Sequence, residues 1–297
     1  MTRKKPKISV FPKCYFDQIC SGEINLVDWI YDAVNLGAEG IEHYDGFFKS
    51  SSYQDVEPVL QALNETNQIT SMLCFSPDFT HPDPVERQQQ LERQKNAIDL
   101  SVMLRTRYCR TLSGQNYKGM SRTEGIERTV DGISKSLEYA VQHDVVLCME
   151  NHYKDGLWTR SEFAQPEDIF LEIIEQIDSP FFGVQYDPSN AIVGGYDPVV
   201  FLEKVKHRVV TMHASDRYLA EGISLDELQQ VGDAKGYSDK LLHGVTGQGL
   251  NDYDTIFRIL AEVDFHGWIS VEDGMNGLEE IGESVDFLKE MRAIHYG

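Results

Sequence analysis

Eight short runs of β-type residues recur along the chain, and segments with helical periodicity separate most of them. The runs cover residues 8–11, 40–44, 72–75, 107–112, 145–150, 182–187, 209–213 and 268–272. Strands that alternate with helices form βαβ units, right-handed crossovers and a parallel sheet. Because no linker or change in composition divides the 297 residues, we predict an α/β fold with one domain, a (β/α)8 TIM barrel over residues 1–297. An open doubly wound sheet is the alternative.

One segment interrupts this alternation. Residues 217–252 lie between the seventh run and the next helical pattern, and they exceed an ordinary βα loop in length. Active sites of this fold are built from the βα loops, so we expect this excursion to overhang the barrel mouth as a lid or as a wall of the pocket. Residues 225–231 are compatible with a short helix.

The charge balance argues against two classes of partner. The chain has 27 Lys and Arg residues against 48 Asp and Glu residues, which gives a formal net charge of −21 at pH 7. A field of that sign repels phosphate backbones and anionic lipid. We therefore expect neither nucleic acid nor a membrane as a partner, and the composition leaves homo-oligomerisation open.

The distribution of apolar residues and cysteines suggests a cytoplasmic protein. No apolar run is long enough for a signal peptide or approaches the ~18 residues of a membrane-spanning helix. The five cysteines have neither zinc-ribbon nor redox spacing, so we expect them to be reduced thiols with a structural role.

Polar groups that bind metals follow the last four β-type runs. These groups are Glu150, Asp187, His213 and Glu272. Parallel strands of a barrel direct their carboxyl ends to one face, so these side chains are expected to converge although they lie far apart in the sequence. The alternative is that each is an ordinary residue of the barrel mouth, solvated or hydrogen-bonded to a loop.

Three carboxylates in contact require a compensating cation to stay ionised. One imidazole with three carboxylates is an oxygen-rich ligand set, for which Mn²⁺ is our first expectation, and Mg²⁺, Co²⁺ and Zn²⁺ are alternatives. The sequence therefore predicts one divalent metal ion bound by Glu150, Asp187, His213 and Glu272.

These residues, in this order, carry a resemblance. His213 begins a His-x-x-Asp-Arg segment, Glu272 follows Gly267-Trp268, and residues 37–42 and 247–249 add glycine-rich matches. The chain resembles the xylose-isomerase-like superfamily of sugar phosphate isomerases and epimerases. The resemblance implies that the four ligands hold the ion and that two carboxylates, here Glu150 and Glu272, transfer protons on opposite faces of the substrate.

The segment after the fifth run departs from the epimerase pattern. It reads Glu150-Asn151-His152-Tyr153 and is more similar to relatives that act on 3-keto sugars and 3-keto glycosides, in which a histidine removes the proton and the aglycone leaves by elimination. His152 would be a better free base than a metal-bound carboxylate, because its pKa lies near neutrality. The alternative is that His152 only hydrogen-bonds a neighbouring carboxylate.

Four further residues are predicted to contact the substrate: Arg217, His243, Glu42 and Trp158. Arg217 offers a guanidinium to a substrate oxygen, or else pairs with Asp216. His243 lies in the excursion and is otherwise a solvated loop residue. Glu42 is the inward-facing choice at the end of the second run, and Trp158 either stacks on a sugar or fixes its own loop.

Isomerase or epimerase chemistry on a small-molecule sugar or keto-sugar is our first functional prediction. It proceeds by removal of a proton next to a carbonyl. A metal-dependent lyase that cleaves 3-keto C- or O-glycosides, with His152 as base, is the second, and a non-catalytic sugar-binding barrel is the third. An apurinic endonuclease shares this fold, but the net charge of −21 and the single histidine among the ligands argue against it.

Overall fold

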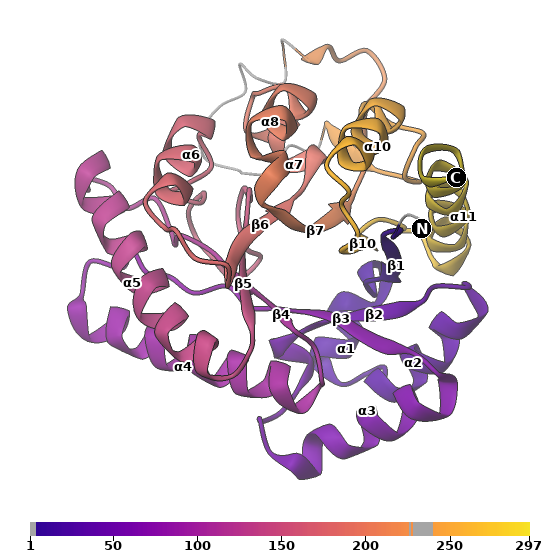
Figure 1. The fold of residues 1–297 in the computed structure, drawn as a ribbon, viewed down its shortest axis with the longest axis horizontal. Helices are drawn as coiled ribbons and strands as arrows, with labels where there is room; N and C mark the ends of the chain where they lie inside the picture. Colours follow the sequence, from indigo (N-terminus) through magenta and orange to yellow (C-terminus); the bar gives the residue numbers. More distant parts are fainter. Residues whose placement is uncertain (1–3, 226, 228–239) are drawn as a thin grey trace.

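Eight parallel strands close into a barrel (Figure 1). The structure is a computed structural model that describes residues 4–225, 227 and 240–297. The strands are β1 (Lys7–Val10), β2 (Gly40–Tyr44), β3 (Ile69–Cys74), β4 (Tyr108–Thr111), β5 (Val146–Glu150), β6 (Phe182–Tyr186), β7 (Val209–Ala214) and β10 (Trp268–Val271). Their order around the barrel is β1-β10-β7-β6-β5-β4-β3-β2. The prediction of a TIM barrel is confirmed, and each predicted run overlaps one strand.

Helices surround the barrel on its outside. The long ones are α2 (Leu26–Asn35), α3 (Tyr53–Thr66), α4 (Pro84–Met103), α5 (Arg122–Gln142), α6 (Glu167–Glu175), α8 (Pro198–Val205), α10 (Tyr253–Glu262) and α11 (Leu278–Tyr296). Polar side chains cap several of their first turns, as Asp83 does for α4 and Ser121 for α5. Among the described residues, no helix has both the length and the apolar character needed to span a membrane.

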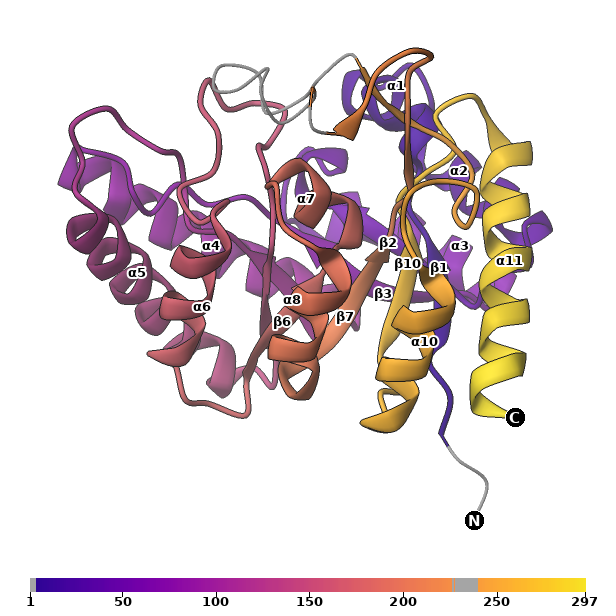
Figure 2. The same ribbon diagram turned by 90° about the horizontal axis from the view of Figure 1, so that it is seen from above.

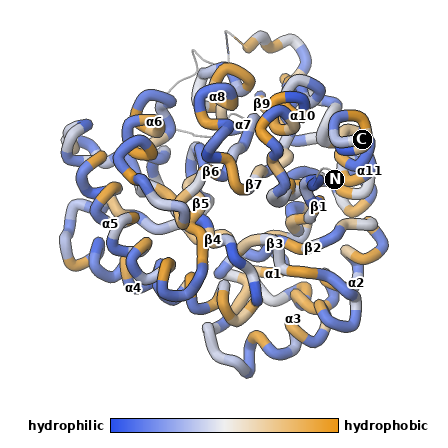
Figure 3. The backbone as a smooth tube through the Cα atoms, in the orientation of Figure 1, coloured by the Kyte–Doolittle hydropathy of each residue, from blue (hydrophilic) through white to orange (hydrophobic). Residues whose placement is uncertain are grey.

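Apolar side chains form two clusters, one on each side of the sheet. The larger fills the space between the strands and the helices. Along the helices in Figure 3, hydrophobic and hydrophilic residues alternate, as expected for helices with one buried face. The smaller lies inside the barrel and contains Met72, Cys74, Val146 and Cys148. Met72 Sδ contacts Thr211 Oγ1 at 3.6 Å from the opposite wall, so side chains fill the interior below the mouth.

The carboxyl ends of the strands share one end of the molecule. Figure 2 shows the short helix α7 (Pro188–Val193) there, with the start of β1 and the C-terminus toward the opposite end. The excursion of residues 217–252 rises from this mouth and contains two short antiparallel strands, β8 (Arg217–Leu219) and β9 (Leu241–His243). The short helix predicted within residues 225–231 falls mostly outside the described residues.

His43 on β2 is a fully buried, neutral histidine. Its ring lies against Phe48, on the helix side of the sheet, and burial lowers its pKa to about 3. An unfolded chain binds this proton near pH 6.5, so the unfolded state takes up more protons below that pH. The contribution of His43 should therefore lower the free energy of unfolding as the pH falls from about 6.5 toward 3.

We expect wild-type protein to lose about 2 kcal/mol more unfolding free energy than a His43→Leu variant between pH 7.5 and 5.0. Urea unfolding of both proteins at the two pH values measures this difference, and the variant controls for all other titrating groups. Equal losses in the two proteins would contradict a neutral His43.

Candidate metal and proton-transfer site

Four potential metal ligands come from four neighbouring strands. Glu150 ends β5, Asp187 directly follows β6, His213 lies in β7 and Glu272 directly follows β10. Each offers one ligand atom, and these atoms all lie within 4.8 Å of one another. The structure thus brings together the four residues that the strand ends predict as metal ligands.

The inner carboxylate oxygens of this cluster face one ring nitrogen of His213. Nδ1 lies 3.1 Å from Glu150 Oε1, 3.1 Å from Glu272 Oε2 and 4.0 Å from Asp187 Oδ2. His213 and the carboxylates of Glu150 and Asp187 are buried. Three oxygens and one nitrogen therefore converge where one ion would fit.

The other oxygen of each carboxylate already has a partner. Arg110 Nη1 binds Glu150 Oε2 (2.7 Å), Ser215 Oγ binds Asp187 Oδ1 (2.9 Å), and Lys13 Nζ binds Glu272 Oε1 (2.8 Å). These contacts fix the orientation of the three groups and leave their inner oxygens directed at Nδ1. An arrangement of this kind holds ligands in place before an ion binds.

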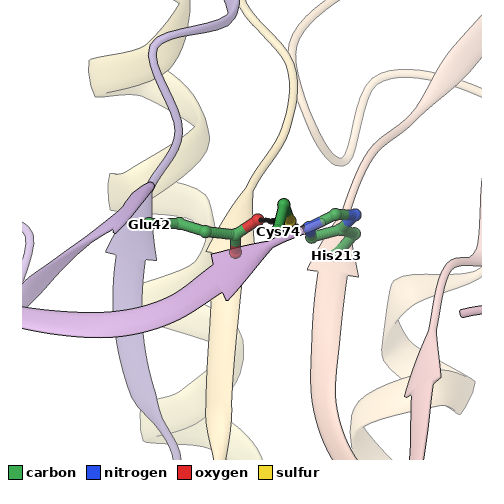
Figure 4. Close-up of side chains that lie close together, drawn as sticks. All are labelled: Glu42, Cys74 and His213. Atoms are coloured by element: carbon green, nitrogen blue, oxygen red, sulfur yellow. Dashed lines mark hydrogen bonds and ion pairs between the residues drawn. The ribbon is translucent and has the colours of Figure 1, made fainter. Parts of the chain in front are cut away.

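Glu42 orients the far side of the His213 ring, as Figure 4 shows. Its Oε1 lies 2.7 Å from Nε2 of His213 and accepts a hydrogen bond from Cys74 Sγ at 3.0 Å. A proton on Nε2 leaves the lone pair of Nδ1 for a metal ion. Burial raises the pKa of the Cys74 thiol, so Cys74 is a neutral donor to Glu42 and a poor metal ligand.

Without a cation, the cluster retains protons. Burial and the charges of Glu150 and Glu272 raise the pKa of Asp187 to about 7. Burial opposes ionisation of Glu150 as well, but His213 and Arg110 hold its pKa at about 2. Burial lowers the pKa of His213, and the surrounding carboxylates raise it well above its usual range. A divalent ion would therefore displace protons when it binds.

His152 faces a second buried carboxylate. Its Nδ1 lies 3.3 Å from Glu162 Oε2, and Glu162 Oε1 accepts hydrogen bonds from the backbone N–H and the hydroxyl of Ser113, both at 2.9 Å. Burial lowers the pKa of His152, but Glu150 and Glu162 raise it above its ordinary value overall. The carboxylate thus orients the ring and leaves Nε2 on the opposite side.

Arg217 and His243 pair across the β8–β9 ribbon. Both are nearly buried: Arg217 lies over the ring of Tyr153 at 5.4 Å, and His243 Nδ1 lies 2.9 Å from Asp273 Oδ1. Burial and nearby cationic charge lower the pKa of His243 to about 2, so the ring is neutral. Asp216 instead accepts backbone N–H groups, including that of Arg217. The predicted substrate contacts of Arg217 and His243 stay predictions.

Trp158 lies in the loop that follows β5. Its side chain is buried, and it lines a cavity of about 200 Å³ together with residues that follow β2, β3 and β4. Glu42, also predicted to contact the substrate, lies instead behind His213 in the barrel interior.

Sequence reasoning did not find three of the residues that shape this site. Arg110 could have been recognised from the sequence, because a charged residue inside a buried β-type run usually has a specific partner. Lys13 stands two residues beyond the first run, at the same end as the predicted ligands. Glu162 gave no signal, since it reaches His152 from a long irregular loop.

The family assignment rests on a match over most of the chain. The model of the family described as xylose isomerase-like TIM barrel matches residues 30–291. Inosose dehydratase of Geobacillus kaustophilus (strain HTA426) is 30% identical over 157 residues, which cover 50% of this chain and 47% of that protein. Inosose dehydratase of Mesomycoplasma hyopneumoniae (strain 7448) is 22% identical over 284 residues, or 91% of this chain and 90% of that protein. The chain thus spans about half the length of the first relative and most of the second.

Solved structures share the fold. A D-tagatose 3-epimerase-like protein superposes with a TM-score of 0.76 at 18% identity and covers 97% of each chain. The probable 3-DHS dehydratase of Bacillus anthracis has a TM-score of 0.71 at 20% identity and covers 95% of this chain and 98% of its own. With the barrel, the cluster at its mouth and the family match in agreement, this chain belongs to the xylose isomerase-like TIM barrel family.

Proposed function

We propose that this protein is a sugar-modifying enzyme that uses one divalent metal ion, Mn²⁺ first, to remove a proton next to the carbonyl of a keto sugar or cyclic polyol ketone. The observation that carries the proposal is the convergence of three inner carboxylate oxygens on Nδ1 of His213. Carboxylate oxygens with a single imidazole suit Mn²⁺, Mg²⁺ or Co²⁺. Once bound, such an ion supplies Lewis-acid stabilisation of the negative charge that develops on the substrate oxygens.

Both predicted proton-transfer carboxylates are weak bases in this site. Glu150 is held by Arg110 on one oxygen and by Asn190 Nδ2 (3.1 Å) on the other, and its pKa is about 2. Glu272 accepts a hydrogen bond from Lys13 on its outer oxygen; burial opposes its ionisation, but Lys13 holds its pKa well below its usual range. We therefore assign both carboxylates to metal binding.

His152 is the base that the geometry favours. A general base works best with a pKa near the operating pH, and a carboxylate partner raises the basicity of an imidazole and fixes its orientation. Glu162 is that partner for His152. One oriented base beside a carbonyl suits an elimination, in which His152 takes the proton and then returns it to the group that leaves the next carbon as water or as an aglycone.

Dehydration is therefore our first choice among the outcomes of proton removal. The relatives that match this chain by sequence and are named inosose dehydratase support it. Isomerisation or epimerisation, with Glu150 and Glu272 transferring protons on opposite faces, is the second candidate. It is favoured by the place of both glutamates in the ligand cluster at the barrel mouth.

A substrate panel in deuterated water tests this proposal. The probes are an inosose, D-tagatose and methyl 3-keto-β-glucoside, each with protein that has been stripped of metal and reloaded with Mn²⁺. We expect metal-dependent exchange of the proton next to the carbonyl, followed by loss of water from the inosose. Exchange into D-tagatose with formation of its epimer would support the epimerase instead. No exchange with any probe would contradict the enzyme and favour a sugar-binding barrel.

Glu42 provides a test of metal binding away from the ligands. Loss of a carboxylate that orients a metal-ligating histidine typically weakens binding roughly 10–100-fold. We expect this loss of Mn²⁺ affinity, measured by titration calorimetry, in a Glu42→Gln variant. Cys74→Ala, which removes the other neighbour of Glu42, is the matched control and should retain affinity within a few-fold. If the Glu42→Gln variant bound Mn²⁺ with wild-type affinity, Glu42 would have no role in metal binding.

A further inference from the structure

Two cavities lie beside the metal ligands, centred on the other half of the barrel mouth. The ligands end or follow β5, β6, β7 and β10. The cavities are lined by residues at the ends of β2, β3 and β4, by helix α4 and by the loop after β5 that carries Trp158. Their volumes are about 180 and 200 Å³, and they share Asp45, Phe75 and Arg93 as walls. Both halves belong to the face on which this fold builds active sites.

Aromatic surfaces line the larger cavity. Tyr44, Phe75 and Trp158 contribute to its walls, and Phe75 and Trp158 are 2% and 8% exposed. The Arg93 guanidinium lies over the Phe75 ring at 5.6 Å from its centroid. Buried aromatic faces in a small cavity are suited to the apolar faces of another ring.

A partly desolvated carboxylate lies between the two cavities. Burial raises the pKa of Asp45 to about 6, against the charges of Arg93 and Arg110, which lower it. Asp45 accepts a backbone hydrogen bond from Gly46, whereas Asp78 and Asp155 accept hydrogen bonds from side chains such as the Tyr117 hydroxyl and Ser76. Asp45 is thus the carboxylate in these walls best placed to accept hydrogen bonds from hydroxyl groups of a ligand.

One side chain joins the cavity wall to the metal cluster. Arg110 donates from Nη1 to Glu150 Oε2 at 2.7 Å and from Nη2 to Ser76 Oγ at 2.8 Å. Ser76 lines the cavity and donates to Asp155 Oδ2 at 2.6 Å. A single guanidinium therefore separates the metal ligand Glu150 from this wall.

We propose that the two cavities form a second subsite, which binds an uncharged, hydroxylated ring attached to the sugar that reacts at the metal. Among the substrates of the proposed function, this subsite favours a keto sugar with a ring substituent over an unsubstituted inosose. The ring packs on Phe75 and Trp158 with its hydroxyls toward Asp45. Three acidic side chains against one arginine among the walls disfavour a phosphate at this position. The inference rests on the proposed function for the identity of the reacting sugar.

Binding measurements test the subsite independently of turnover. The probes are methyl β-glucoside, 4-hydroxyphenyl β-glucoside and cellobiose, titrated calorimetrically into Mn²⁺-loaded protein. We expect at least one ring-bearing probe to bind about tenfold more tightly than the methyl glucoside. Comparison of 4-hydroxyphenyl β-glucoside with cellobiose shows whether the ring is aromatic or a second sugar.

Two variants assign this preference to the cavity walls. Trp158→Ala and Asp45→Asn should each reduce the preference for the ring-bearing probe to less than threefold. Tyr53→Ala, which removes an exposed aromatic residue on α3, should leave it intact. Equal binding of all probes by wild-type protein, or a preference that survives in both cavity variants, would overturn the subsite.

The 3-keto forms of the same probes separate this inference from the proposed function. Exchange in deuterated water with a lower KM for the ring-bearing form supports both. A binding preference that depends on Trp158, without exchange in any 3-keto form, would support the subsite and contradict the proposed chemistry.

Discussion

Wild-type protein is expected to bind one Mn²⁺ ion per chain, and Glu150→Gln and His213→Ala are expected to lose it. Each variant alters one of four donors that converge within 4.8 Å, and Glu150→Gln also leaves Arg110 without its charged partner. Loss of the Lewis acid is worth several kcal/mol, so proton exchange should fall by about 10³-fold or more. Metal content after gel filtration and exchange into the best keto probe measure the two effects.

Surface variants of the same residue types provide the control. Glu283 and His266 are exposed, so Glu283→Gln and His266→Ala should retain metal and activity. An ion retained at full stoichiometry by both site variants, or no specific ion in wild-type protein, would refute the metal site. Circular dichroism separates loss of the ion from loss of the fold.

Removal of the His152 imidazole should lower kcat by about 10²–10⁴-fold while Mn²⁺ binding persists. His152→Gln retains a polar side chain and leaves all four ligands in place. Because the base acts in its neutral form, the wild-type rate should rise with pH up to the pKa of His152, which neighbouring carboxylates raise above its ordinary 6.5. Rapid-quench exchange with metal-loaded protein measures the rate.

Glu162 allows a positioning role to be distinguished from a structural one. Its charge raises the pKa of His152, so Glu162→Gln should move the acidic limb of the pH–rate profile to lower pH and reduce kcat. His207→Gln, at an exposed site, should change neither. If the His152→Gln variant exchanged the proton at a rate within a few-fold of wild type, His152 would not be the base. Glu272 would then be the candidate, and the epimerase would be favoured.

The barrel could be predicted because its two signals are local. Apolar runs and helical periodicity depend on neighbours in the sequence, and the eight runs match the eight strands. The convergence of Glu150, Asp187, His213 and Glu272 also followed, because parallel strands end on one face. Helices α3 and α8 did not stand out in the pattern of apolar residues.

The partners of these residues could not be predicted, because they depend on which loops meet. Glu162 reaches His152 from residues that form no regular element, and Lys13 meets Glu272 from the other end of the chain. Alternation along β2 lets only one of Glu42 and His43 face inward, and it does not show that His213 is the neighbour of Glu42 across the barrel. Which side chains meet across a closed barrel depends on the tertiary structure and cannot be read from one strand.

The filled interior of the barrel determines how molecules travel to and from the cluster. Met72 and Thr211 meet across the barrel beneath the ligands, so side chains of the described residues fill the interior at this level. A substrate of the proposed reaction would therefore reach the cluster from the mouth, and its product would leave the same way. A product with a ring held between Phe75 and Trp158 would occupy that route and delay the next turnover.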